Sequence, residues 1–284
     1  MKFVIGTAQI KKSYGILGNH LKLSEAKKIF RTKRKNIDYV DTAPTYGISE
    51  SYLGKNLNKN IKIITKLDKL RSKKKNNVCK EIERKIIKSF NKFNRTIYCV
   101  LFHNEDDANW LKEKLVRNKL KEMIENKYIN KIGISCYQYK NIQNYCKFFK
   151  FDIFQIPLNA LNISEKKIEY LKKLKKRYGF KIHARSIFLQ GVLLINNKNI
   201  PNKLQKLKKK LIKIKNKIES KNVETYNYLI SIIDNLKLVD CAVIGVKNYN
   251  EFINLKNYKK IKLTKNEIYR FRLKQSKILD PRNW

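Results

Sequence analysis

The most informative run in the chain is DTAPTYGISESYLG, which occupies residues 41–54. It follows an apolar stretch containing Ile37 and Val40, which is typical of a buried strand, and it continues into a pattern typical of a helix. The carboxylate of Asp41 therefore stands where a strand ends, and the phenol of Tyr46 follows on the loop. Barrel enzymes carry their reactive groups at such strand ends, so this run predicts a catalytic site.

Two more polar side chains close the next two strand-like segments. Lys66 ends the run at residues 61–66, and His103 ends the run at residues 97–103. Each of the four groups alone has an ordinary explanation: a partly buried tyrosine, a surface lysine, a structural histidine or a helix-capping aspartate. Their occurrence at three successive strand ends favours a shared site instead.

Strand-like and helix-like segments alternate along the whole chain, which indicates a parallel α/β sheet. Eight strands are predicted, and eight parallel strands close into a (β/α)8 barrel, here a single domain over residues 1–284. An open, doubly wound sheet is the alternative, and it is disfavoured because no G-x-G-x-x-G follows the first strand. The predicted strands lie at residues 3–7, 38–41, 61–66, 97–103, 131–135, 153–156, 181–186 and 242–246.

Two of the intervening segments have clear helical patterns. Residues 25–34 are expected to form a helix with Ser24 as its N-cap and Asn36 in a left-handed conformation after it. Leucines and isoleucines spaced three and four apart in a lysine-rich stretch predict an amphipathic helix over residues 204–218. Its apolar face is expected to pack on the barrel, and attachment to a membrane surface is the less favoured alternative.

The chain is strongly basic, with 66 lysines and arginines against 23 aspartates and glutamates and a formal net charge of +43. Such an excess is typical of proteins that bind nucleic acid or anionic membranes. However, the lysines are spread over nearly every helix-like segment, which favours a general compositional bias over a recognition surface. The five cysteines form no C-x-x-C pair and no apolar stretch has the length of a membrane span, so we expect a cytoplasmic protein without disulfides or zinc.

Asp41, Tyr46, Lys66 and His103 together resemble the catalytic tetrad of the aldo-keto reductases. The resemblance spans nearly the whole chain, because other motifs of that family have counterparts at residues 6–9, 63–66, 101–103, 131–135, 155–159, 185–191 and 243–246. The loop RSIFLQG at residues 185–191 and the ending DPRNW at residues 280–284 resemble a bacterial subgroup of the family. The resemblance implies an NAD(P)H-dependent reductase of a small aldehyde, ketone or sugar, which needs no metal.

Reduction of a carbonyl requires a hydride at carbon and a proton at oxygen. No side chain donates hydride, so a nicotinamide must supply it, and Tyr46 is the candidate proton donor. The ordinary pKa of a phenol is near ~10, and a nearby ammonium such as that of Lys66 is expected to lower it. Asp41 would hold Lys66 through a charge-assisted hydrogen bond, and His103 would orient the substrate carbonyl or share the proton relay.

The resemblance also implies which residues hold the cofactor. Ser135 and Gln155 would bond the nicotinamide carboxamide, the loop after the seventh strand would cradle the pyrophosphate, and the end of the eighth strand would meet the adenosine phosphate. The residues expected at the cofactor are Gly6, Thr7, Ser135, Gln155, Arg185, Ser186, Phe188, Leu189, Gly191, Gly245, Lys247 and Glu251.

Three features depart from the family's pattern. Cys136 replaces an asparagine that is frequent beside the carboxamide serine, and Arg185 stands where an aromatic residue often stacks on the nicotinamide. The planar guanidinium of Arg185 is able to stack in its place. After the eighth strand, Lys247 could bind a 2′-phosphate, whereas Glu251 would repel it or bond a bare ribose. The basic surroundings favour NADPH, with NADH left open.

Two other functions stay open on the sequence. One is a barrel that binds NADP(H) for sensing or regulation with little turnover, and the other is a basic, polyanion-binding protein on a barrel scaffold. We expect a small carbonyl compound as the partner rather than nucleic acid or a membrane, and the oligomeric state is not predicted.

Overall fold

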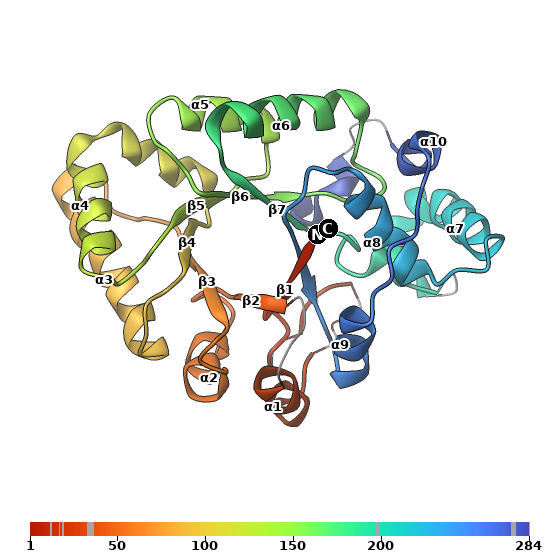
Figure 1. Ribbon diagram of the computed structural model, residues 1–284, viewed down its shortest axis with the longest axis horizontal. Helices are drawn as coiled ribbons and strands as arrows, with labels where there is room; N and C mark the ends of the chain where they lie inside the picture. The colour runs from red at the N-terminus through yellow and green to blue at the C-terminus, as the bar shows by residue number, and fades with distance from the viewer. Residues whose placement is uncertain are drawn as a thin grey trace.

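The computed structural model describes residues 1–11, 13–16, 18, 20–32, 37–196, 199–273 and 277–283, without the side chains of residues 203, 277 and 282. Eight parallel strands close into a barrel in their order along the chain, because β1 pairs with both β2 and β8 (Figure 1). The predicted (β/α)8 architecture is therefore confirmed, and the open-sheet alternative is wrong. The strands are β1 (Lys2–Gly6), β2 (Ile37–Asp41), β3 (Lys62–Leu67), β4 (Cys99–Phe102), β5 (Ile132–Ser135), β6 (Ile153–Pro157), β7 (Lys181–Arg185) and β8 (Cys241–Gly245).

Helices surround the barrel wall (Figure 1). The α-helices are α1 (Leu23–Arg31), α2 (Ser49–Asn56), α3 (Lys75–Phe93), α4 (Lys114–Glu125), α5 (Ile142–Cys146), α6 (Glu165–Tyr178), α7 (Gln205–Glu219), α8 (Thr225–Asn235), α9 (Tyr249–Lys256) and α10 (Lys265–Tyr269). Short 3₁₀ helices lie at Glu105–Lys112, Tyr139–Asn141, Val192–Leu194, Asn202–Leu204, Lys277–Leu279 and Pro281–Asn283. In the described part of the chain, no helix has the length and apolar character needed to span a bilayer.

The first helix begins earlier than the sequence predicted. Lys22 is the N-cap of α1, and Ser24 lies inside the helix, so the prediction that Ser24 caps it is wrong. Lys22 offers no side-chain bond to the helix end, and the apolar side chains of Ala26, Ile29 and Phe30, which are buried, set the helix position instead. The helix ends at Arg31 and Thr32 is extended, so the predicted extension to residue 34 is wrong. The predicted left-handed conformation of Asn36 lies outside the described residues.

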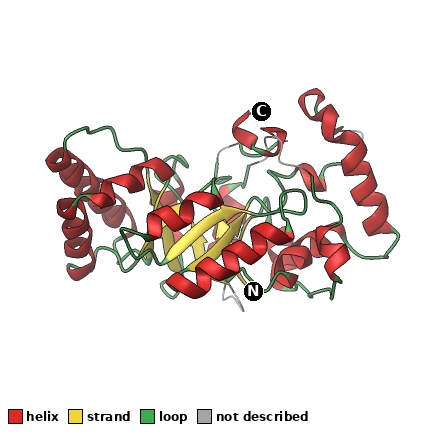
Figure 2. Ribbon diagram, turned by 90° about the horizontal axis from the view of Figure 1, so that it is seen from above, coloured by secondary structure: helices red, strands yellow, loops and turns green. Residues whose placement is uncertain are grey.

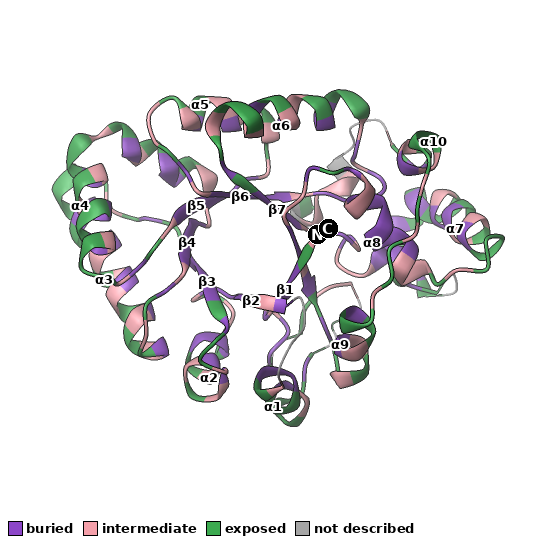
Figure 3. Ribbon diagram, in the orientation of Figure 1, coloured by how far each residue is buried: buried purple, intermediate pink, exposed green. Residues whose placement is uncertain are grey.

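Apolar side chains fill the space between the barrel wall and the helices. Figure 3 shows buried strands and buried inner faces of helices, with exposed outer faces. The predicted amphipathic helix is confirmed as α7, which packs beside α8 and buries Leu207, Leu211, Ile214 and Ile218. Each buried side chain of this size contributes about 1.5–3 kcal/mol. A smaller cluster inside the barrel takes side chains from β1–β4, β6 and β8: Val4, Tyr39, Ile64, Cys99, Leu101, Ile153 and Cys241.

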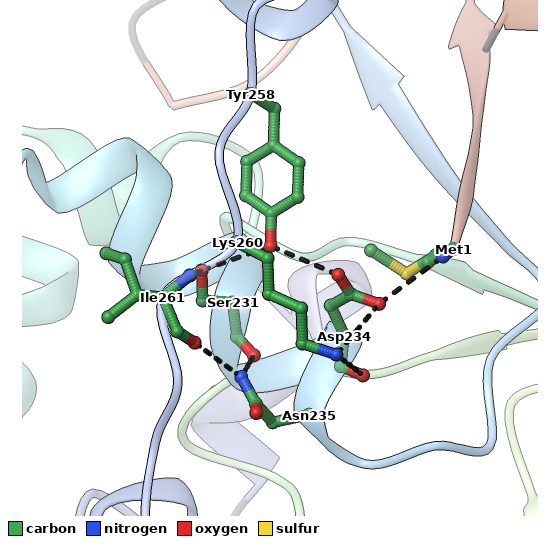
Figure 4. A network of polar contacts seen from close by, with 7 residues as sticks. All are labelled: Met1, Ser231, Asp234, Asn235, Tyr258, Lys260 and Ile261. Atoms are coloured by element: carbon green, nitrogen blue, oxygen red, sulfur yellow. Dashed lines mark hydrogen bonds and ion pairs between the residues drawn. The ribbon is translucent and has the colours of Figure 1, made fainter.

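The two ends of the barrel are closed differently. Figure 2 shows the N-terminus at one end and the C-terminal turns at the other. At the N-terminal end, the polar network of Figure 4 joins the start of β1 to α8 and to the segment after α9. The Met1 amino group lies 3.4 Å from Asp234 Oδ1, and the Tyr258 hydroxyl lies 3.3 Å from Asp234 Oδ2. This network leaves the other end of the barrel, where the strands terminate, for the polar groups that the sequence singled out.

Candidate active site

Four polar side chains meet at the carboxyl ends of β2, β3 and β4. Asp41 is the last residue of β2, Lys66 lies one residue before the end of β3, and His103 directly follows β4. Tyr46 lies in the turn between β2 and α2. Parallel strands direct their carboxyl ends to the same edge of a barrel, so residues distant in sequence arrive at one place. The structure thus brings the four predicted residues together.

Lys66 is the centre of this group. Its ammonium donates to Asp41 Oδ1 at 2.5 Å, to the Thr42 carbonyl at 3.0 Å and to the Tyr46 hydroxyl at 3.3 Å. These bonds use the three donors of an ammonium. Lys66 is buried, so the alternative of an ordinary surface lysine is wrong. Asp41 is held from its other side as well, because Gln155 Nε2 donates to its Oδ2 at 2.7 Å.

The neighbours of Lys66 maintain its charge. Burial disfavours the ammonium, but the Asp41 carboxylate and the Tyr46 hydroxyl outweigh burial and raise the pKa of Lys66 above its usual value. A lysine with a raised pKa stays protonated at neutral pH. Lys66 is therefore a fixed positive charge beside the Tyr46 hydroxyl.

His103 lies next to Tyr46 and is uncharged. The two rings meet edge-on, with centroids 6.2 Å apart and planes at 87°. Burial in the first place, and the Lys66 ammonium in the second, lower the pKa of His103 to about 4. At neutral pH its imidazole consequently has one N–H donor and one acceptor nitrogen.

A buried carboxylate behind the tetrad was not predicted. Glu50 of α2 accepts from Thr65 Oγ1 at 2.7 Å, from Ser89 Oγ at 2.9 Å and from Lys92 Nζ at 2.8 Å. Thr65 precedes Lys66 in β3, so these bonds fix α2 and α3 against the strand that carries Lys66. The signal in the sequence was the spacing of Glu50 and Leu53, which places a carboxylate on the apolar face of α2.

The residues expected at the nicotinamide carboxamide lie beside the tetrad. Ser135 ends β5, pairs in register with Gln155 of β6, and is buried like Gln155. Because Gln155 bonds Asp41, this amide links the two groups of residues directly. Cys136, which replaces the family's asparagine, is also buried, and burial raises the pKa of its thiol. Its Sγ lies 3.2 Å from the Gln138 carbonyl oxygen, so the thiol bonds the protein itself.

The loop that follows β7 has an unusual backbone. Residues with side chains rarely adopt positive φ, and such conformations concentrate at ligand sites. Gly15, with a φ of +80°, allows the β1 loop to approach this loop, because a Cβ there would lie 2.9 Å from the Gln190 carbonyl oxygen. The Ile16 N–H donates to the same oxygen at 3.0 Å. In the β7 loop, positive φ occurs at Ser186 (58°), Leu189 (48°), Gln190 (54°) and Gly191 (92°).

Two aromatic contacts complete the description of this loop. Phe188 packs against Tyr226 with ring centroids 4.9 Å apart. The guanidinium carbon of Arg185 lies 4.1 Å from the centre of the Tyr137 ring. In this structure the guanidinium of Arg185 therefore stacks on Tyr137, a residue of the loop after β5.

The end of β8 contains the residues expected near the adenosine phosphate. Gly245 pairs in register with Gly6 of β1. Lys247 Nζ lies 3.4 Å from Glu251 Oε1, and the Lys247 backbone N–H donates to Glu251 Oε2 at 2.8 Å. The Thr7 hydroxyl donates to the Asp41 carbonyl at 3.0 Å, so it serves to hold β1 against the end of β2.

The donor set at this edge fits a nicotinamide dinucleotide. Ser135 and Gln155 offer hydroxyl and amide groups of the kind that a carboxamide bonds, while Ser186 begins the tight loop and Lys247 places a cation further along the edge. These groups follow one another from β5 to β8 around the barrel.

Comparisons with known proteins agree with this geometry. The solved structure of an aldo-keto reductase from Bacillus halodurans, in its holo form, is 16% identical, with 95% of this chain and 90% of that chain covered and a TM-score of 0.73. An aldo-keto reductase from Bombyx mori in complex with NADP is 16% identical, with coverage of 99% and 92% and a TM-score of 0.70. The glycerol dehydrogenase from Gluconobacter oxydans is 18% identical, with coverage of 95% and 89% and a TM-score of 0.71.

At these identities the structural matches establish the fold alone. A search of curated proteins found no match. A family model described as "Aldo/keto reductase family" matches residues 2–274, which is nearly the entire chain. The protein therefore belongs to the aldo/keto reductase family and is an NAD(P)H-dependent oxidoreductase.

Proposed function

We propose that the protein reduces the carbonyl group of a small aldehyde, ketone or sugar, with Tyr46 as the proton donor. The observation that carries this proposal is the bridge formed by Lys66, whose buried ammonium bonds Asp41 on one side and the Tyr46 hydroxyl on the other. A phenol beside a fixed cation is suited to releasing its proton, because the cation stabilises the phenolate that remains.

The reaction needs one hydride and one proton. NAD(P)H, when bound, supplies the hydride to the carbonyl carbon. The Tyr46 hydroxyl gives its proton to the carbonyl oxygen, so that the product is an alcohol and the protein is left with a phenolate. Lys66 faces that phenolate oxygen. Asp41 keeps Lys66 in place through a bond of 2.5 Å, and Gln155 in turn holds Asp41 by donating to it at 2.7 Å.

His103 has a narrower part in this mechanism than the sequence suggested. With a pKa of about 4, its imidazole is neutral at pH 7 and is a weak source of protons. We propose that it donates one N–H to the carbonyl oxygen and so holds the substrate beside Tyr46. The relay alternative would require a protonated imidazole, which burial and Lys66 disfavour.

We further propose NADPH as the preferred cofactor, held by Gly6, Ser135, Gln155, the loop after β7 and the end of β8. Lys247 supports this preference, since it places a cation near the expected 2′-phosphate. Glu251 weakens the preference because it pairs with Lys247 at 3.4 Å. The excess of positive charge would draw either anionic nucleotide toward the protein.

The test is a fluorescence titration of the protein with NADPH and NADH in parallel, followed by a rate screen over aldehydes, ketones and sugars. We expect tighter binding of NADPH and measurable oxidation of it with at least one carbonyl compound. Absence of binding by both nucleotides would refute the proposal. Binding without turnover across the screen would instead support the regulatory alternative.

A further inference from the structure

A cavity lies beneath the C-terminal turns. It shares Arg185, Ser186 and Leu189 with the expected cofactor site and extends beyond them to Lys167 and Arg272. It has a volume of about 220 Å³ and is lined by residues that follow β5 and β6, by the end of β7 and, near the C-terminus, by Arg272, Leu273, Leu279, Asp280 and Pro281. A single water needs only about 10–15 Å³ of such space, so the cavity admits a larger group. Among the described residues, three cations line it, Lys167, Arg185 and Arg272, and one carboxylate, that of Asp280.

Lys167 is the most unusual of these residues. It is only 8% exposed, although lysines are almost never fully buried without an ionic partner. Its ammonium has backbone carbonyls as partners, those of Pro157 and Asn162 at 3.4 Å each, and among the described residues no carboxylate forms an ion pair with it. Burial lowers the pKa of Lys167 to about 8, which is the behaviour of a cation that lacks a counter-ion.

Arg185 connects this cavity with the tetrad. Its Nε and Nη2 are buried without hydrogen-bond partners among the described residues, and its Nη1 is 3.4 Å from Ser186 Oγ. Buried donors without partners are costly, so a ligand acceptor at this place would stabilise the folded protein. The positive charge of Arg185 also contributes to the lowered pKa of His103, which places the guanidinium within electrostatic reach of the reacting groups.

We propose that this cavity binds an anionic group, a carboxylate or a phosphate, carried by the carbonyl substrate. The proposal rests on the carbonyl reduction proposed above and specifies the substrate class. An anion here would accept from the Lys167 ammonium and from the unpaired nitrogens of Arg185, and charge-assisted bonds of this kind are the strong ones. Arg272, which is exposed, also lines the cavity.

The kinetic test compares two aldehydes that differ in charge, 4-oxobutanoate and its methyl ester. The measured quantity is the ratio of their kcat/KM values for the unaltered protein and for Lys167→Met, with Lys167→Arg as the charge-preserving variant. Lys166→Met is the matched control, because Lys166 is the exposed neighbour on α6. Losing one charged hydrogen bond corresponds to about a 10- to 100-fold effect, so the ratio should fall by that factor in Lys167→Met and largely recover in Lys167→Arg.

Two kinetic results would overturn the proposal. One is an unaltered protein that does not prefer the carboxylate, and the other is an equal drop of the ratio in Lys167→Met and Lys166→Met. The second result would mean that the general surface charge, and not the cavity, attracts the anion. Thermal melting of each variant shows whether it has folded.

A binding experiment keeps this inference separate from the proposed function. Inorganic phosphate is titrated by calorimetry into the unaltered protein, Lys167→Met and Lys166→Met, with and without NADPH. We expect the protein to bind phosphate, and Lys167→Met to weaken this binding by about tenfold or more. Lys166→Met should leave the binding unchanged, and NADPH should not displace the phosphate. Displacement by NADPH would assign the cavity to the cofactor, and absence of binding would remove the site. If no carbonyl compound is reduced, the proposed function fails, but these titrations still decide the fate of the anion site.

Discussion

Replacement of Lys66 by methionine is the most instructive perturbation of this site, because it removes one charge and nearly preserves the volume of the side chain. In the native protein the ammonium lies 3.3 Å from the Tyr46 hydroxyl. With an effective dielectric constant of about 20, a full negative charge on that oxygen interacts with the ammonium by about 5 kcal/mol. A factor of ten in rate corresponds to about 1.4 kcal/mol, so the loss would reach about three orders of magnitude.

The same substitution also affects stability. Asp41 is buried and, in the described part of the chain, would keep only Gln155 as a side-chain hydrogen-bond partner. Breaking a buried ion pair typically costs about 3–5 kcal/mol. A fall in activity through unfolding must therefore be separated from a fall through chemistry. The double variant Lys66→Met with Asp41→Asn removes the unpaired carboxylate. It should regain most of the melting temperature while its hydride-transfer rate stays low.

The assay is a single-turnover measurement of nicotinamide absorbance with saturating carbonyl substrate, run beside a thermal melt and an NADPH titration. We expect hydride transfer to slow by about 1,000-fold, within the range of about 100- to 10,000-fold that a positioned acid contributes. A folded, cofactor-binding Lys66→Met protein whose rate stays within about tenfold of the native rate would show that the Lys66 charge does not assist the reaction.

Three further predictions concern titration, packing and cofactor choice. Since the pKa of His103 is lowered to about 4, its imidazole should stay neutral in an NMR titration down to about pH 5. The His103→Gln variant identifies the His103 signal, and a titration midpoint near 6.5 would contradict the prediction. Between these two values the unfolded chain binds a proton that the native protein does not, so the free energy of unfolding should decrease as pH falls through this window. Gly54→Ala should lower the free energy of unfolding in urea by more than about 3 kcal/mol, because a Cβ there would lie 1.8 Å from the Lys92 carbonyl oxygen. The control Ser51→Ala, on the exposed side of the same helix, should change this free energy by less than about 0.5 kcal/mol. Equal effects of the two substitutions would disprove the close contact at Gly54. Glu251→Gln should release Lys247 from its ion pair and improve the affinity for NADPH by up to about fivefold, without improving the affinity for NADH. An unchanged ratio of the two affinities would show that Lys247 does not contact the 2′-phosphate.

The barrel and its tetrad were predictable because both depend on local patterns. Each predicted strand overlaps an observed one, because a short apolar run bounded by polar residues is typical of a buried strand in a parallel sheet. Once the strands are ordered, Asp41, Lys66 and His103 must share one edge of the barrel. Spacing alone was therefore sufficient to group residues that lie 62 positions apart in the chain.

Other contacts depend on three-dimensional packing that spacing does not encode. The bond between Gln155 and Asp41 joins residues 114 positions apart, and nothing in either local sequence signals it. The stacking of Tyr137 on Arg185 likewise depends on how the loop after β5 folds back. Lys167 left a signal that was overlooked, since its spacing from Leu171 and Leu174 places it on the buried face of α6.

The departure at Ser24 has a different origin. A serine before a helical pattern is a good N-cap candidate, but the chain enters α1 one residue earlier than that position, at Leu23. Packing of Ala26, Ile29 and Phe30 against the barrel decides the position of the helix, because burial of three apolar side chains outweighs a cap that contributes about 1 kcal/mol.

If the Tyr46 hydroxyl provides the proton for carbonyl reduction, Tyr46→Phe should stop the reaction, since this substitution removes a single oxygen atom. The measurement is the rate of NADPH oxidation with a carbonyl substrate, together with the dissociation constant of NADPH for the same preparation. This role for Tyr46 predicts a rate at least about 100-fold lower with cofactor affinity essentially unchanged. A Tyr46→Phe protein that reduces the carbonyl at the native rate would contradict it.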